Sequence, residues 1–231
     1  MVDGQDKTGA SYRPVGRETL QEQIFSQLEE RLLTGQFAPG EKLALRGLAA
    51  ALGTSLMPVR DALQRLSSTG VVTAGPNRTL IVPQLSKAEV EEIVEVRRAL
   101  ECLAAERAAR YATEAGLLQL SQCEQDIEDA ANAGDYKAFL RTNWHFHLTL
   151  AEIGGSAMIV SLLKTVWLRL GPILRPVRSD RDSLLVVIPI HKNITAAISS
   201  RDPEAARRAI EEDLGGVWIM ERFDEQVGGA A

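Results

Sequence analysis

Residues 47–70 read GLAAALGTSLMPVRDALQRLSSTG, and this stretch has the pattern of two short helices joined by a tight turn. Its apolar residues form one stripe at helical spacing before Gly53 and a second stripe after it. Gly53 suits the turn because glycine tolerates a positive φ, and Ser55 is placed to cap the second helix. Arg60 and Arg65 lie off the apolar stripe, so the pattern favours a helix-turn-helix that exposes arginine. An antiparallel helix pair in a bundle core is the alternative.

The flanking segments argue against that alternative. Upstream, residues 19–35 carry leucine and isoleucine four residues apart, which is typical of an amphipathic helix. Downstream, Val71–Thr73 and Thr79–Val82 predict two short strands, and the turn between them carries an arginine. Three helices followed by a two-stranded hairpin is the order of a winged-helix DNA-binding domain.

Residues 18–83 closely resemble the N-terminal domain of GntR-type bacterial transcription regulators. The resemblance rests on landmarks at matching spacing, among them Pro39-Gly40, Leu52-Gly53 and Pro58-Val59-Arg60. It implies DNA contacts at positions on the second helix, the recognition helix and the wing. These positions are Arg46, Ser55, Leu56, Met57, Arg60, Asn77 and Arg78.

This chain departs from the family pattern at two of those positions. The family usually has an arginine followed by a small polar residue where this chain has Leu56 and Met57. Neither side chain can form a bidentate contact with guanine, so we expect an apolar contact there, for instance with a thymine methyl group.

The charge distribution is compatible with DNA binding although the net charge is −5. Residues 1–85 contain 9 Lys and Arg against 8 Asp and Glu, whereas residues 86–231 contain 17 against 23. Within residues 42–78 the only acid is Asp61, beside five basic residues. The positive field is therefore local, and a dimer would present it at two half-sites.

Length and composition favour two domains in a chain that does not enter a membrane. The 231 residues are 45% hydrophobic and 25% charged, and no apolar run approaches the roughly 20 residues that span a bilayer. Residues 1–16 are polar and lack the apolar core of a signal peptide. We expect a disordered arm over 1–16, a winged-helix domain over 17–84, and a cytoplasmic location.

From residue 85 the pattern predicts helices only. Ser86 and Glu89 form a capping box at the start of one long helix, and no strand signal follows Val82. Asp202 and Pro203 mark the start of a last helix that is expected to reach about Gln226. We therefore predict a mainly α protein, with a bundle of six or seven helices over residues 85–226 after the winged helix.

Histidine, aspartate and asparagine in this bundle suggest a metal site. Asn143 and His147 are four residues apart on one predicted helix and share a face, whereas His145 must point elsewhere. His191 begins a later helix and Asp213 lies on the last one. Such donors suit a divalent transition metal, although hydrogen-bonded core or surface residues are the alternative.

The segment from Val90 to Phe223 resembles the FCD domain, the effector domain of the FadR-like branch of GntR regulators. The matching residues include Arg97 with Leu100-Glu101, the Phe146-His147 pair and His191. The resemblance implies a divalent transition metal, zinc or similar, bound by one aspartate and three histidines. The corresponding residues here are Asn143, His147, His191 and Asp213.

This donor set departs from the family pattern at both ends. Asparagine replaces the first aspartate and aspartate replaces the last histidine, so one carboxylate and four potential donors remain. An amide oxygen is a weaker ligand than an imidazole, and we therefore expect weaker metal binding than in the three-histidine version.

The resemblance also implies that the domain senses small organic acids and dimerises. An arginine fork can pair with both oxygens of a carboxylate, which makes arginines the candidate effector ligands. Arg97 is the first choice because it matches a family position, and Arg141 and Arg175 follow. Each could instead form a surface ion pair.

Three classes of function fit these features. The favoured one is a ligand-responsive repressor or activator that binds a palindromic operator as a homodimer. A metal-dependent hydrolase is an alternative, but no general base is evident beside the metal residues and the winged helix would have no role. A constitutive architectural DNA-binding protein is the third class. We therefore expect a regulator and no enzyme.

Overall fold

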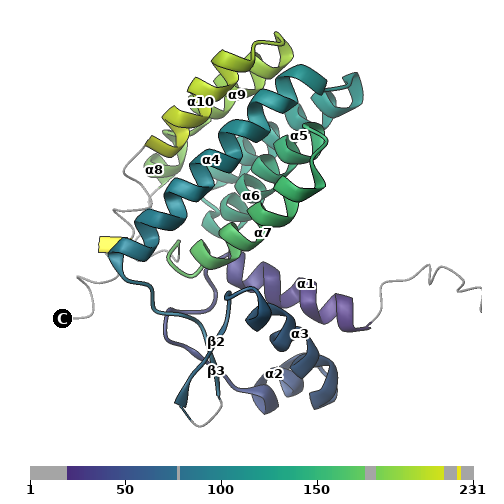
Figure 1. Ribbon diagram of the computed structural model, residues 1–231, viewed down its shortest axis with the longest axis vertical. Coiled ribbons are helices and arrows are strands. Elements are labelled where there is room, and N and C mark those ends of the chain that lie inside the picture. The colour runs from purple at the N-terminus through teal and green to yellow at the C-terminus, as the bar shows by residue number, and fades with distance from the viewer. Residues whose placement is uncertain (1–19, 77–78, 175–180, 216–222, 225–231) are drawn as a thin grey trace, which may run out of the picture.

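The structure is a computed structural model that describes residues 20–76, 79–174, 181–215 and 223–224. A small winged-helix domain packs against one end of an elongated helical bundle (Figure 1). The predicted arm over residues 1–16 and the predicted extension of the last helix to Gln226 lie outside the described residues. The mainly α architecture predicted from the sequence is confirmed.

The described residues of the winged-helix domain form three helices and a small antiparallel sheet with strand order β1-β3-β2. Leucines and isoleucines on one face of α1 pack with the apolar face of α3 to form its core. The helices are α1 (Leu20–Leu33), α2 (Leu45–Ala51) and α3 (Leu56–Ser68), and the strands are β1 (Lys42–Leu43), β2 (Thr73–Ala74) and β3 (Leu80–Ile81).

The wing differs from the sequence prediction in its first strand. The strand predicted over Val71–Thr73 begins two residues later, as β2 at Thr73, because Val71 and Val72 are both buried and their N–H groups bond back to the carbonyl of Leu66. Two consecutive buried side chains do not fit the alternation of a half-buried strand. The strand β1 was not predicted, since two residues give no pattern to detect.

The backbone of the turn between α2 and α3 has the predicted conformation. Gly53 has φ +63°, a left-handed conformation that favours glycine. Ser55 stands in the N-cap position of α3 with an extended backbone, but its side chain makes no capping hydrogen bond. The predicted cap is therefore wrong, and the hydroxyl stays available at the exposed start of α3.

The bundle contains seven helices among the described residues. The capping box of Ser86 and Glu89 is confirmed at the start of the first, and Asp202 caps the last through a 2.9 Å hydrogen bond from the Ala205 N–H. The central helix α6 contacts α4, α5 and α7. The helices are α4 (Lys87–Tyr111), α5 (Glu114–Ala133), α6 (Tyr136–Ile153), α7 (Ala157–Leu170), α8 (Arg181–Leu185), α9 (Ile188–Ser199) and α10 (Pro203–Gly215).

Two further features of the fold bear on function. The helix α1 contacts α6 and α7 as well as α3, so it links the winged helix to the bundle. Within the described part of the chain, none of the helices combines the length and the apolar character needed to cross a membrane.

Candidate metal centre and DNA-binding surface

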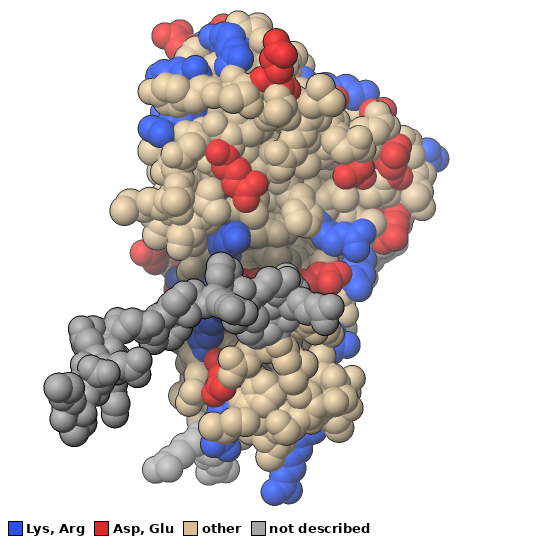
Figure 2. Space-filling model, turned by 90° about the vertical axis from the view of Figure 1, so that its right-hand side faces the viewer, with Lys and Arg blue, Asp and Glu red and all other residues tan. Residues whose placement is uncertain are grey.

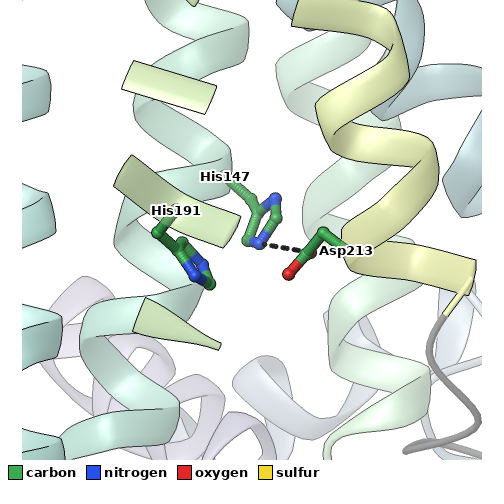
Figure 3. A group of neighbouring side chains, drawn as sticks. All are labelled: His147, His191 and Asp213. Carbon is green, nitrogen blue, oxygen red and sulfur yellow. Dashed lines mark ion pairs between the residues drawn. The ribbon is translucent and has the colours of Figure 1, made fainter. Parts of the chain in front are cut away.

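Three helices of the bundle bring His147, His191 and Asp213 together. Their side chains point toward one another from α6, α9 and α10 (Figure 3), and one donor atom from each lies within 4.8 Å of the others. His147 Nε2 is 3.4 Å from Asp213 Oδ2. Asn143, one turn before His147, places its Oδ1 2.8 Å from His191 Nε2. The structure thus brings together all four residues that the sequence singled out for a metal.

A buried carboxylate orients the first imidazole. His147 Nδ1 lies 2.9 Å from Glu101 Oε2, a close approach whose angles are not those of a hydrogen bond. Burial alone would raise the pKa of Glu101, but the charge and the hydrogen bonds of Arg97, together with the adjacent His147, bring it down to about 2. An ionised Glu101 favours a proton on Nδ1, so a neutral His147 would present its lone pair at Nε2, on the side of Asp213. That atom is buried and has no hydrogen-bond partner among the described residues.

A backbone carbonyl orients the second imidazole. His191 Nδ1 lies 2.9 Å from the Val187 carbonyl oxygen, and burial lowers the pKa of His191, which favours its neutral form. The neutral ring then donates from Nδ1 and presents a lone pair at Nε2, toward Asn143 Oδ1. Two acceptors 2.8 Å apart require that the Asn143 amide turns to donate, or that both atoms bind one cation, which would hold them slightly farther apart.

The donor set fits a divalent transition metal. Two imidazole nitrogens, one carboxylate oxygen and one amide oxygen converge, and each imidazole has a second partner of the kind that metal-binding histidines use. Ligand atoms around a zinc ion with bonds of about 2.0–2.2 Å lie roughly 3–4 Å apart. The 3.4 Å separation of His147 and Asp213 is already in this range.

Glu101 and Trp167 belong to this centre, although the sequence analysis did not select them as site residues. The Arg97 Nε–H donates to Glu101 Oε1 at 2.7 Å, and the Trp167 Nε1–H donates to the same oxygen at 2.8 Å. The guanidinium carbon of Arg97 lies 3.9 Å from the centre of the Trp167 ring. The available signal was the four-residue spacing of Arg97 and Glu101, which places both charges on the buried face of α4.

Of the predicted effector arginines that the structure describes, one lies beside the candidate metal centre and one does not. Arg97 is 2% exposed and reaches the centre through Glu101. Arg141 is exposed on another face of α6, where its Nη1 lies 3.9 Å from Glu30 Oε1 of α1, so the structure does not bring it to the metal residues. Arg175 lies outside the described residues. Thr195 is one turn after His191 on α9, and its buried hydroxyl has no hydrogen-bond partner within the described ranges.

The predicted DNA contacts that the structure describes all lie on the surface of the winged helix. Arg46 is exposed in the first turn of α2, and Ser55, Leu56, Met57 and Arg60 are exposed at the start of α3. Leu56 is 41% exposed and Met57 61%, which is high for apolar side chains on a domain with a core of its own. The wing residues Asn77 and Arg78 lie outside the described residues.

Arg65 has a structural contact that separates it from Arg60. Its guanidinium carbon lies 3.8 Å from the centre of the Phe25 ring on α1. This cation–π contact ties α3 to α1. Arg60 instead remains on the exposed face of α3, beside Leu56 and Met57.

Comparisons with known proteins agree with both halves of this description. Residues 20–82 match the model of the bacterial regulatory proteins of the gntR family, and residues 92–216 match the FCD domain. The HTH-type transcriptional regulator McbR of Escherichia coli K12 is 28% identical over 192 residues, which span 82% of this chain and 87% of that protein. The HTH-type transcriptional repressor RspR of the same strain is 26% identical over 198 residues, or 85% and 86% of the two chains.

Solved structures show the same fold. The structure of E. coli McbR/YncC has a TM-score of 0.84 and 25% identity, and it covers 90% of this chain and 100% of that chain. A putative GntR regulator from Rhodococcus sp. RHA1 matches in fold, with a TM-score of 0.73, 21% identity, and coverage of 87% and 97%. These relatives are transcription regulators and not enzymes. The chain therefore belongs to the GntR family of bacterial regulatory proteins and carries an FCD domain after its helix-turn-helix domain.

Proposed function

We propose that this transcription regulator binds a divalent transition metal in its FCD domain, senses a small organic acid there, and binds a palindromic operator as a homodimer. The ligands are His147, His191, Asp213 and Asn143. The observation that carries the proposal is the convergence of their donor atoms, with both Nε2 lone pairs directed inward by Glu101 and by the Val187 carbonyl. Because operator DNA is the partner, we infer a cytoplasmic location.

The charges around the centre favour an anionic effector. Glu101 and Arg97 compensate each other, so Asp213 contributes the remaining negative charge among the donors. A bound dication would make the site net positive and would supply an open position for a carboxylate. The unpartnered hydroxyl of Thr195 offers a hydrogen bond from the same face of α9.

The buried pair limits what Arg97 does for the effector. Two of its N–H groups already point to Glu101, at 2.7 and 3.4 Å. Arg97 therefore acts first on Glu101, which orients His147, and only its remaining N–H groups can meet a ligand.

The dimer that we propose forms through α4 and α7. These two helices pack against each other, and each carries large apolar side chains on its exposed surface. Val96 and Leu103 on α4 are 45% exposed, and Met158 and Leu162 on α7 are 75% and 48% exposed. A two-fold contact through this surface would place two recognition helices for half-sites about one turn of DNA apart.

Light scattering tests the dimer with Leu103→Glu and Leu162→Glu. Both should shift the protein toward monomer, because an isologous contact meets each introduced charge twice. Leu118→Glu is the matched control, since Leu118 is 75% exposed on α5, outside this surface. A wild-type monomer that still binds operator tightly would refute the proposed dimer.

Metal analysis combined with operator binding tests the sensor. We expect stoichiometric metal in the wild type, and loss of metal and of acid-dependent operator binding in His147→Ala and His191→Ala. His145→Ala is the control, because His145 is exposed on a different face of α6. A wild type without metal, or alanine variants that still respond to the acid, would place sensing elsewhere. An operator affinity that changes neither with metal nor with organic acids would favour the constitutive architectural function.

A further inference from the structure

A second pocket lies between the winged helix and the bundle, apart from the metal centre. The helix α1 forms one wall and α6 and α7 form the other, around a volume of about 290 Å³. Figure 2 shows basic and acidic side chains gathered at the waist between the two parts of the molecule. The metal centre, in contrast, is built from α4, α6, α9 and α10.

The floor of this interdomain pocket is apolar. Leu33 of α1, Trp144 and Leu148 of α6 and Leu168 of α7 line it, and each is 8% exposed or less. Such a floor favours an apolar group in the pocket, because covering it removes apolar surface from water.

At the edge of the pocket, the acidic side chains come from one wall and the basic side chains from the other. Glu29 and Glu30 come from α1, whereas Arg141 and Lys164 come from α6 and α7. Among these four groups, Arg141 and Glu30 form an ion pair across the pocket at 3.9 Å, and both side chains are about half exposed, at 49% and 45%. Burial raises the pKa of Glu29, although Lys164 and Arg65 oppose this effect. A ligand cation beside Glu29 would therefore meet a carboxylate that water solvates poorly.

We propose that the interdomain pocket binds a free amino acid with an apolar side chain, as a second effector site. The carboxylate pairs with Arg141 and Lys164, the ammonium group with Glu29 and Glu30, and the side chain covers Trp144. A simple organic acid would offer no cation to the glutamates, and a simple amine would offer no carboxylate to the two basic side chains. The volume is at the small end of ligand pockets, which suits one amino acid and excludes a nucleotide.

A glycine contact sets the width of the pocket. Gly171 follows α7, and a Cβ atom at this position would collide with the Leu32 carbonyl and lie 2.8 Å from the Leu33 Cα. Only glycine lets the end of α7 meet the end of α1 this closely. The two walls are thus held at a fixed distance beside the pocket.

The position of the pocket links its ligand to DNA binding and to the metal centre. The wall formed by α1 packs against α3, the recognition helix, so a ligand bridging both walls would hold α3 in one placement. Behind the floor, the Trp144 ring lies 5.8 Å from the Trp167 ring, whose N–H binds Glu101. The proposal does not depend on metal binding.

Calorimetry on the full-length protein tests the pocket, with L-phenylalanine, L-leucine and L-tryptophan as probes. At least one should bind at one site per chain. The matched analogues 3-phenylpropionate and phenethylamine each lack one charged group, and should bind about tenfold or more weakly than phenylalanine. Arg141→Gln should weaken amino-acid binding by a similar factor. Lys137→Gln, on the same helix but outside the pocket, should leave binding unchanged.

Two more variants separate this site from the metal centre. Gly171→Ala should weaken amino-acid binding, because it forces α1 away from α7, and should leave metal content unchanged. His147→Ala should retain amino-acid binding. The proposal is overturned if no probe binds at millimolar concentration, if the analogues bind as tightly as phenylalanine, or if binding is lost in His147→Ala and kept in Arg141→Gln.

Discussion

The two domains place their functional side chains in opposite environments. Arg46, Met57 and Arg60 are exposed on the winged helix. His147, Glu101 and Arg97 are at most 2% exposed in the bundle and depend on one another. Exposed residues can change with little effect on folding, whereas a buried charge network joins ligand binding to stability. Substitutions of the DNA-contacting residues should therefore change operator binding without changing stability. Substitutions in the buried network should change effector sensing and stability together.

The largest effect is expected for Glu101→Gln. Removing this charge leaves Arg97 buried without a carboxylate to pair with, which should lower the free energy of unfolding by ~3–5 kcal/mol. Glu106→Gln is the control on the same helix, because Glu106 pairs with Arg110 and Arg207 near the surface and should cost ~1 kcal/mol or less. Denaturant unfolding at one fixed protein concentration measures both. Equal losses would show that the buried network has no special role.

Metal should stabilise the folded protein through the same network. Zinc at 100 times its dissociation constant should raise the free energy of unfolding of the wild type by ~2.7 kcal/mol. His191→Ala should lose this gain, and His145→Ala should keep it. Thermal unfolding with and without zinc, after treatment with a chelator, gives the comparison. A gain that survives in His191→Ala would contradict the site.

Arg60 and Arg65 lie on the same helix, α3, and test whether an exposed arginine and an arginine with a structural contact play different roles. Arg60→Ala should reduce operator affinity by ~1–3 kcal/mol if it contacts a base, and should change stability by less than about 0.5 kcal/mol. Arg65→Ala should instead lower stability by ~0.5–1 kcal/mol, since it loses the contact with Phe25. Mobility shift at fixed salt and denaturant unfolding measure the two effects. A loss of stability in Arg60→Ala would contradict the view that the exposed DNA-contacting residues do not contribute to the stability of the fold.

The smallest effect concerns the apolar start of the recognition helix. Met57→Ala should reduce operator affinity by about 1 kcal/mol or less, as expected for partial burial of one apolar side chain. Replacing thymine by uracil at the contacted step should have the same effect on the wild type and no further effect on the variant, because both remove one apolar contact. Additive losses would mean that Met57 does not contact a thymine methyl group.

The sequence determined the winged helix and the starts of the first and last bundle helices, because their signals are local. Gly53, the capping box of Ser86 and Glu89, and Asp202 with Pro203 each act on neighbouring backbone, and the structure shows their effects where expected. At Val71 and Val72, which are both buried, the local pattern placed the start of the strand β2 two residues too early. The short strand β1 depends on its partner β3 and leaves no pattern of its own.

The candidate metal centre shows the same division between local signals and tertiary packing. The sequence indicated Asn143, His147, His191 and Asp213 through spacing and family resemblance, and the structure places them together. Only the tertiary structure showed that Glu101 and Trp167 complete the centre, and that Arg141 faces α1 instead. A helical period fixes which residues share a face, but the packing of α4, α6 and α7 decides what that face meets. The interdomain pocket follows from the same cause, since its walls come from segments more than 100 residues apart that meet only after folding.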